Sequence, residues 1–354
     1  MLLRTLSLFL VLITACRTTN SGTSSPKSDE LGSKVVKYIE KKDKEGNFFP
    51  MVEGELGICS FNIKWLGHVG KQNETLADLL KNCDAIVIQE LVVPFDVSIL
   101  DKPPANCAKM TDHAKAGAGI NYDCEAQAFF HAMSKIFTGV KLGEDSTSEV
   151  DPPSSATAAE WPVLFYNRKT IEVTEPNEFV STPIKNGHTF DRVPYAFGLR
   201  AVGGGPDFII VSVHLAADNK SGSQKKKRLE EFGAIKSWIE KWQKNSPERD
   251  IFIVGDTNIA SFEELDAILS DQYLADFETL NPSLERTVVS TTSSSPFDQV
   301  FFNPRNLSLE VQPRLEIIDL RKVIPFEGTD RSFGFPYSDH LPIRFKIKNN
   351  PDND

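Results

Sequence analysis

Residues 84–90 read DAIVIQE, a run of four apolar residues that follows an aspartate and ends in a glutamine and a glutamate. A short β-branched run without polar alternation is typical of a strand that is buried on both faces of its sheet. Such a strand needs a packed layer on either side of it. Glu90 would then lie at the carboxyl end of the strand, where the sheet reaches solvent.

The remaining apolar runs predict more strands, interleaved with amphipathic helices. Two of the predicted connections are hairpins, one around Asn167-Arg168 and one around the glycine cluster 203–205. This order favours two packed sheets with helices on the outside. The predicted strands are 56–66, 84–89, a strand from 140 onward, 161–166, 170–173, 193–201, 208–215, 250–254, 298–302, 315–320 and 341–347, and the predicted helices are 73–80 with Asn73 as its cap, 123–137, 224–243 and 262–269.

Five short polar motifs stand in order along the chain, most of them at the ends of these apolar runs. Together they supply amides, carboxylates and two imidazoles. A hard divalent cation binds oxygen ligands from carboxylates and amides, and an alkoxide leaving group needs a positioned acid. The set therefore predicts metal-dependent hydrolysis of a phosphate ester. The motifs are SFN at 60–62, QE at 89–90, SVH at 212–214, GDTN at 255–258 and SDH at 338–340.

In this order the motifs resemble those of the endonuclease/exonuclease/phosphatase superfamily, and within it the DNase I-like branch. The resemblance extends from Gly57 to Lys348. It implies an α/β fold with four layers, in which two packed mixed sheets are flanked by helices. It further implies a metal-dependent endonuclease that takes DNA as its substrate and Mg²⁺ as its cofactor, with Mn²⁺ or Ca²⁺ as alternatives.

The resemblance assigns a metal-binding group of side chains. Glu90 is expected to be the principal ligand, and Asn62 to offer its amide oxygen to the same ion or to its water. Asp339 is expected to belong to the same group. Asp256 would position the attacking water or a second metal. A solvated acid at a strand end and an ordinary turn asparagine are the competing interpretations of Glu90 and Asn62.

Two histidines are expected to exchange protons with the substrate, each oriented by a carboxylate on its other ring nitrogen. The resemblance pairs His214 with Glu160 and His340 with Asp298. A lone histidine is more often a surface residue or a hydrogen-bonded core residue, so this expectation depends on the pairing.

The resemblance also assigns residues to the substrate phosphate. Asn258 is expected to hold it, although capping of the helix that follows is a competing interpretation. Gln299 occupies a position where the family often has an arginine. Arg192 is expected to compensate for that missing cation.

The start of the chain is typical of an export signal. Arg4 precedes the apolar run 6–13, which is too short to span a bilayer, and the run ends in Ile13-Thr14-Ala15-Cys16. That ending resembles a bacterial lipobox, in which the cysteine becomes lipid-modified; an ordinary secretory signal is the alternative. We expect a signal peptide at 1–15, a lipidated Cys16 with a tether to 33, and one catalytic domain at 34–350. We expect the protein to be an exported monomer that is anchored by its lipid to a bacterial membrane, at the periplasmic or surface face of the outer membrane.

The net charge bears on how the protein could bind nucleic acid, and the cysteines bear on which disulfides it could form. The net charge of −10 argues against a protein that binds nucleic acid through bulk positive charge. The basic run 225–228 is interpreted as a solvated helix face, with a DNA-binding patch as the alternative. Cys59 is interpreted as a small core residue, and Cys107 and Cys124 could form a disulfide, but the pairing among these and Cys83 stays open.

Two other functions remain open at this point. A phospholipid or sphingomyelin phosphodiesterase could use the same fold, and the aromatic segment 333–337 is the one part of the sequence that could contact a lipid surface. A non-catalytic binding lipoprotein would be expected to carry substitutions among the metal-site residues, and all of those residues are present.

Overall fold

The structure is a computed structural model that describes residues 53–67, 70–93, 124–143, 160–184, 190–217, 222–290, 292–307, 312 and 314–350. In this part of the chain the strands form two six-stranded mixed sheets. The first sheet has the order β11 (Glu316–Ile317), β12 (Ile343–Lys348), β1 (Glu55–Leu66), β2 (Ala85–Leu91), β4 (Val163–Tyr166) and β3 (Gly139–Leu142), and the second has the order β5 (Ile171–Phe179), β6 (Tyr195–Ala201), β7 (Asp207–His214), β8 (Ile251–Asp256), β10 (Asp298–Phe302) and β9 (Glu278–Thr279).

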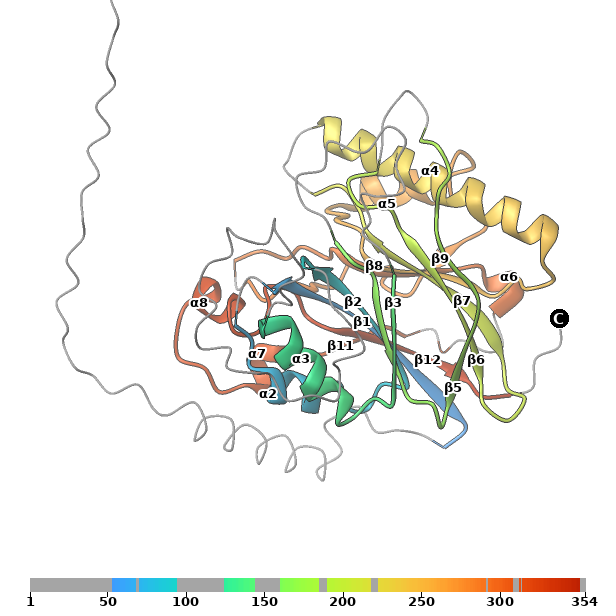
Figure 1. Ribbon diagram of the computed structural model, residues 1–354. Coiled ribbons are helices and arrows are strands. Elements are labelled where there is room, and N and C mark those ends of the chain that lie inside the picture. The colour runs from blue at the N-terminus through green and yellow to red at the C-terminus, as the bar shows by residue number, and fades with distance from the viewer. Residues whose placement is uncertain are drawn as a thin grey trace, which may run out of the picture.

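Helices cover the outer faces of both sheets, which confirms the predicted four-layer sandwich (Figure 1). The rings of Phe232 in α4 and Phe301 in β10 lie 5.5 Å apart, and those of Phe130 in α3 and Phe165 in β4 lie 4.9 Å apart. On the second sheet lie α4 (Gly222–Asn245) and α5 (Phe262–Ile268); on the first lie α2 (Asn73–Leu80), α3 (Cys124–Ser134), α7 (Leu320–Val323) and α8 (Asp330–Gly334), and the short α6 (Pro304–Leu307) follows β10.

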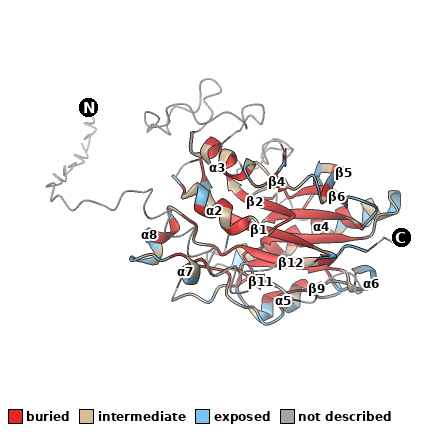
Figure 2. Ribbon diagram, turned by 90° about the horizontal axis from the view of Figure 1, so that it is seen from below, coloured by how far each residue is buried: buried red, intermediate tan, exposed pale blue. Residues whose placement is uncertain are grey.

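The apolar run of β2 is explained by two separate hydrophobic cores. Ala85 and Val87 belong to the core between the sheets, whereas Ile86 and Ile88 belong to the core between the first sheet and its helices. Because successive side chains of a strand point to opposite faces, a strand between two cores has no polar position. The central strands are accordingly buried along most of their length (Figure 2).

Two parallel strand pairs, one in each sheet, bring the polar motifs to the same end of the sandwich. In the first sheet Asn62 of β1 lies opposite Gln89 of β2, and in the second His214 of β7 lies opposite Asp256 of β8. The rings of Phe252 and Phe345 lie 4.9 Å apart, which helps to hold the second sheet on the first. The carboxyl ends of four strands therefore meet around one site.

Two of the predicted local structures are wrong. The turn at Asn167 does not close a hairpin, because β4 pairs with β2 and β3 in the first sheet and β5 pairs with β6 in the second. The turn residues signal a reversal but do not say whether the chain stays in its sheet. Asn73 is the first residue of α2 and not its cap, which is Gln72 without a side-chain hydrogen bond. The second predicted hairpin, β6 with β7, is confirmed.

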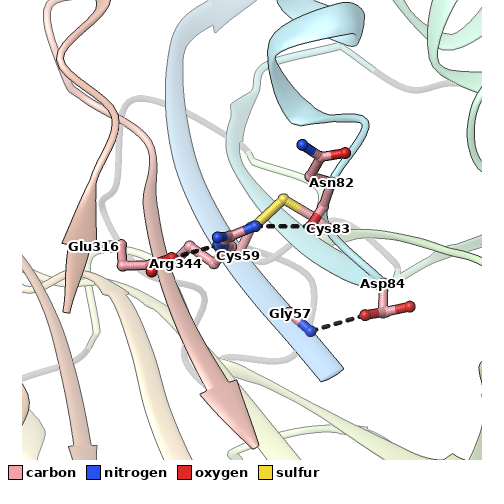
Figure 3. The surroundings of a disulfide bond; sticks show 7 residues. All are labelled: Gly57, Cys59, Asn82, Cys83, Asp84, Glu316 and Arg344. Carbon is pink, nitrogen blue, oxygen red and sulfur yellow. Dashed lines mark hydrogen bonds and ion pairs between the residues drawn. A yellow bond between two sulfur atoms is a disulfide. The ribbon is translucent and has the colours of Figure 1, made fainter. Parts of the chain in front are cut away.

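Cys59 forms a disulfide with Cys83, so its interpretation as a free core cysteine is wrong (Figure 3). The bond joins β1 to the turn before β2, where the two Cα atoms lie 5.9 Å apart. It closes a loop with a sequence separation of 24 residues, and loops of this size gain about 3 kcal/mol of stability from a disulfide. Cys107 and the side chain of Cys124 lie outside the described residues, as do the predicted signal peptide, Cys16 and the tether.

Candidate active site

Asn62 is the hub of the polar cluster at the ends of the parallel strands. Its Nδ2 donates to Glu90 Oε1 and to Asp256 Oδ2, both at 2.9 Å, while its Oδ1 accepts from the backbone N–H of Lys64 at 3.0 Å. Ser338 Oγ donates to the Asn62 carbonyl at 2.7 Å. Asn62 is completely buried, and its contacts tie together the ends of both sheets. An ordinary turn asparagine would not make these contacts.

The first histidine lies beside the carboxylate expected to orient it. His214 Nδ1 is 3.0 Å from Glu160 Oε2, and Glu160 Oε1 is 3.5 Å from Arg192 Nε. Burial alone would raise the pKa of Glu160, but the charges of His214 and Arg192 hold it below its ordinary value. Burial and Arg192 oppose protonation of His214, yet Glu160 raises the pKa of the imidazole overall.

The second histidine has the same arrangement. His340 Nδ1 is 2.8 Å from Asp298 Oδ2, and Thr287 Oγ1 accepts from the backbone N–H of Asp298 at 2.9 Å. Burial opposes the charged imidazole, but Asp298 and Asp256 outweigh it and raise the pKa of His340 to about 10. In both pairs the carboxylate fixes the ring orientation and leaves Nε2 free to face the site.

Asp256 lies between the two histidines. Its Oδ2 is 3.5 Å from Nε2 of His214 and 3.5 Å from Nε2 of His340. Burial would raise the pKa of Asp256, but the two imidazoles and the Asn62 amide lower it, so the carboxylate stays charged. The preceding Gly255 has a φ of 139°, and a Cβ there would lie 2.2 Å from the Val213 carbonyl oxygen. Only glycine allows β8 to deliver Asp256 to this place.

Asn258 is folded back onto the site. Its backbone N–H donates to Asp256 Oδ1 at 3.0 Å, its Nδ2 donates to the Leu215 carbonyl at 3.1 Å, and its φ is 54°. The helix-capping interpretation is wrong, because the cap of α5 is Ser261, whose side chain accepts from the Glu264 N–H. A non-glycine residue in the left-handed region costs free energy and is frequent at functional sites.

Arg192, which is expected to compensate for the arginine that Gln299 replaces, lies in different surroundings from Gln299. Arg192 donates from Nε to the His214 carbonyl at 3.0 Å and from Nη2 to the Leu215 carbonyl at 2.8 Å, so its guanidinium braces the end of β7. Gln299 is completely buried. It accepts from Thr279 Oγ1 at 2.8 Å and donates to the Pro296 carbonyl at 2.7 Å, and thus bonds within the second sheet.

Glu90 and Asp339 lie on the open side of the cluster. Glu90 is partly buried, has a φ of 66° and accepts from the Trp65 N–H at 2.9 Å. Asp339 forms an ion pair with Lys64. Within the described ranges no three acidic, histidine or cysteine side chains are grouped as a ready-made metal site. The donors still fit Mg²⁺, which usually takes one or two protein carboxylates and keeps water and substrate phosphate as its other ligands.

Sequence reasoning missed the polar residues that support this cluster. Gln89 Oε1 accepts from Ser60 Oγ and Gln89 Nε2 donates to Ser212 Oγ, each at 3.3 Å, which links the first sheet to the second beneath the site. Each of these three residues stands within two positions of a predicted site residue, so its place in a motif could have indicated that it supports the site. Lys64 gave no signal of its own.

The basic run 225–228 at the start of α4 forms ion pairs, which neither interpretation from the sequence predicted. Arg228 is almost completely buried and donates to Glu264 Oε1 at 2.7 Å. Lys225 pairs with Glu263 at 2.9 Å, and Lys227 pairs with Asp191. The solvated-face interpretation is therefore wrong for Arg228, whereas Lys226 is exposed, and the paired charges join α4 to α5 and to the segment before β6.

Behind the site, Glu231 of α4 holds two backbone segments. Its Oε2 accepts from the Ala216 N–H at 2.9 Å and its Oε1 from the Asp191 N–H at 3.3 Å. Burial is the largest influence and raises the pKa of this completely buried carboxyl from 4.5 to about 7, although the Ala216 N–H lowers it. The folded protein therefore binds this proton more tightly than the unfolded chain does.

It follows that the stability contributed at Glu231 is present at low pH and is lost as the pH rises from about 4.5 to about 7. Between pH 5 and 8 the wild-type free energy of unfolding should fall by roughly 2–3 kcal/mol more than that of Glu231→Gln, which cannot ionise. Urea denaturation at both pH values measures this difference. Glu240→Gln, on the same helix but exposed, is the control, and equal pH dependence of wild type and Glu231→Gln would contradict the assignment.

Comparisons with known proteins agree with the fold. No protein-family model matches the chain. Deoxyribonuclease gamma of Rattus norvegicus is 22% identical over 304 residues, which cover 83% of this chain and 84% of that protein. An endonuclease/exonuclease/phosphatase family protein of Bacteroides thetaiotaomicron superposes with a TM-score of 0.52 at 13% identity, over 84% of this chain and 98% of that one. The human Nocturnin catalytic domain superposes with a TM-score of 0.51 at 13% identity, over 85% and 97% of the two chains. The chain therefore has the fold of the endonuclease/exonuclease/phosphatase proteins.

Proposed function

We propose that this protein is a divalent-metal-dependent phosphodiesterase that cleaves DNA internally. The observation that carries the proposal is the pair of histidine–carboxylate dyads, whose Nε2 atoms both lie 3.5 Å from one oxygen of Asp256. Two positioned imidazoles around one carboxylate are the groups needed to take a proton from water and to give one to a leaving alkoxide. The 22% identity to a deoxyribonuclease supports DNA as the substrate.

The reaction follows from this arrangement. Water attacks phosphorus, one imidazole accepts its proton, and the other imidazole donates a proton to the leaving oxygen as the P–O bond breaks. Asp256 orients the water and Asn258 holds the phosphate. Mg²⁺, held by Glu90 with Asp339 nearby, would neutralise the charge that develops on the phosphate oxygens.

The structure gives little support to the lipid phosphodiesterase. Of the aromatic residues in segment 333–337, Phe333 and Tyr337 are buried in the core beneath the first sheet, and Phe335 alone is exposed. A membrane-contacting hairpin would present several exposed apolar side chains together. A purely binding protein would have no use for two oriented imidazoles at one carboxylate.

Assays of the purified protein with plasmid DNA, RNA and sphingomyelin test the proposal. Each substrate is incubated with Mg²⁺, Mn²⁺, Ca²⁺ or a chelator. We expect nicking of the plasmid with a divalent metal and none with the chelator. Hydrolysis of sphingomyelin alone would overturn the substrate, and activity in the chelator would overturn the metal dependence.

We also propose that the protein is exported as a lipoprotein and remains a monomer anchored through Cys16. Among the described residues no helix is long and apolar enough to cross a membrane. The Cys59–Cys83 disulfide supports an oxidising compartment, since such bonds persist outside the reducing cytosol.

For the anchor, we expect Cys16→Ser to move the protein from the membrane fraction to the soluble fraction, because the acylated thiol is lost. Fractionation with labelled palmitate incorporation measures this. Thr18→Ala in the predicted tether, which keeps Cys16, is the control and should still incorporate label. Unchanged membrane partitioning of Cys16→Ser would contradict the anchor.

A further inference from the structure

Two exposed aromatic rings stand beside the open side of the site. Trp65 is 48% exposed and Phe335 is 37% exposed, which sets them apart from the buried aromatic residues of the fold. Both rings face one ammonium group: Lys64 Nζ lies 5.5 Å from the centroid of Trp65 and 5.9 Å from that of Phe335. The same nitrogen is ion-paired with Asp339, so the rings adjoin the proposed metal and phosphate groups.

Hydrogen bonds from the site hold the backbone that carries Trp65. Lys64 and Trp65 have φ values of 57° and 52°, and their N–H groups donate to Asn62 Oδ1 and Glu90 Oε2. Two consecutive left-handed residues cost about 1–3 kcal/mol each and persist only where the surroundings enforce them. The Trp65 ring is therefore displayed by the site itself.

The Phe335 side is fixed by a different part of the chain. Its carbonyl accepts from Lys71 Nζ at 3.0 Å, and the carbonyl of Pro336 accepts from the Gln72 N–H at 2.8 Å. Lys71 is itself buried. Rings that are exposed, anchored and placed beside a charged site are suited to stacking on a ligand.

The charge of Lys64 decides which ligand fits. A choline headgroup would be attracted to the rings, but its quaternary ammonium would be repelled by the ammonium that already faces them. A nucleobase has a π face for stacking, and its attached phosphate is attracted to Lys64. In a duplex the base faces are covered by neighbouring bases, so an unpaired base is required.

We propose that Trp65 and Phe335, with Lys64, form a subsite that stacks an unpaired nucleobase next to the cleaved phosphodiester. The inference rests on the proposed function and adds a preference for single-stranded or frayed DNA over a fully paired duplex. Lys64 exchanges its ion pair with Asp339 for the phosphate of the stacked nucleotide.

Binding measurements test the subsite without catalysis. Fluorescence anisotropy in chelator compares a labelled single-stranded oligo(dT) with an oligomer of abasic tetrahydrofuran nucleotides, which has the same backbone and no bases. We expect wild type to bind oligo(dT) about tenfold more tightly, Trp65→Leu to bind both equally, and Trp65→Phe to keep most of the preference. Phe262→Leu removes another exposed ring, on α5, and should change neither affinity.

Kinetics separate this inference from the proposed function. Trp65→Leu should raise KM for single-stranded DNA about tenfold and leave the parameters for the abasic oligomer unchanged. If wild type cleaves neither the two oligomers nor plasmid DNA with metal present, the proposed function fails while the anisotropy still decides the subsite. Equal affinity of wild type for the two oligomers would overturn the subsite. The subsite would also be overturned if Trp65→Leu bound both oligomers as wild type does but bound phosphatidylcholine vesicles more weakly than wild type.

Discussion

Replacing Glu90 by glutamine should reduce DNA hydrolysis to background, with little change in folding stability. The substitution removes the carboxylate charge that would hold the metal, whereas the side chain is only partly buried and keeps one acceptor for the Asn62 and Trp65 N–H donors. Loss of one such hydrogen bond costs about 1 kcal/mol. Plasmid nicking and thermal denaturation measure the two effects.

Metal binding gives a second readout for the same variant. A ligand that binds only the folded state raises its stability, so the wild-type melting temperature should rise with Mg²⁺ concentration and that of Glu90→Gln should not. Glu172→Gln, at an exposed position of β5, is the matched control and should respond as wild type does. Substantial turnover by Glu90→Gln would remove Glu90 from the metal site.

The second large effect is expected at the two histidines. His214→Ala and His340→Ala should each lower the rate by at least ~10²-fold, the usual scale for losing positioned proton transfer. Glu160→Gln and Asp298→Asn should cost less, because each leaves an imidazole in place that is only less well oriented and less readily protonated.

A double-mutant cycle on plasmid nicking at saturating Mg²⁺ tests whether each dyad is one unit. The combination of His214→Ala with Glu160→Gln should be little slower than His214→Ala alone, since both changes act through the same proton transfer. The combination of His214→Ala with Asp298→Asn crosses the two dyads and serves as the comparison. Additive losses within a dyad would show that its members act independently.

The sequence predicted most of the strands because burial on both faces removes polar residues from them. Continuous apolar runs identified β2 and β8, and the polar residues that follow or end such runs identified Asn62, Glu90 and Asp256 as neighbours in space. The pairing of Glu160 with His214 was available only from family resemblance, because 54 residues separate the two in sequence. Their proximity in the structure agrees with the expectation, while their roles remain predictions.

The missed features depend on interactions between distant segments. The turn at Asn167 looks the same whether the next strand stays in its sheet or, as here, joins the other one. Cys59 lies in an apolar strand, and the sequence pattern of that strand does not indicate that its disulfide partner is Cys83 in the turn before the neighbouring strand. Trp65 and Lys64 adopt positive φ values that their side chains disfavour, so no local propensity could have placed that ring at the surface.

The pairing of β1 with β12 has a consequence for how the protein is made. Glu55 lies opposite Lys348, so one edge of β1 stays open until β12 has been synthesised. Sheets closed by residues far apart in sequence form slowly, because a long loop must close first. The first sheet is therefore completed only after β12 has left the ribosome, whereas every strand of the second sheet precedes β12 in the chain.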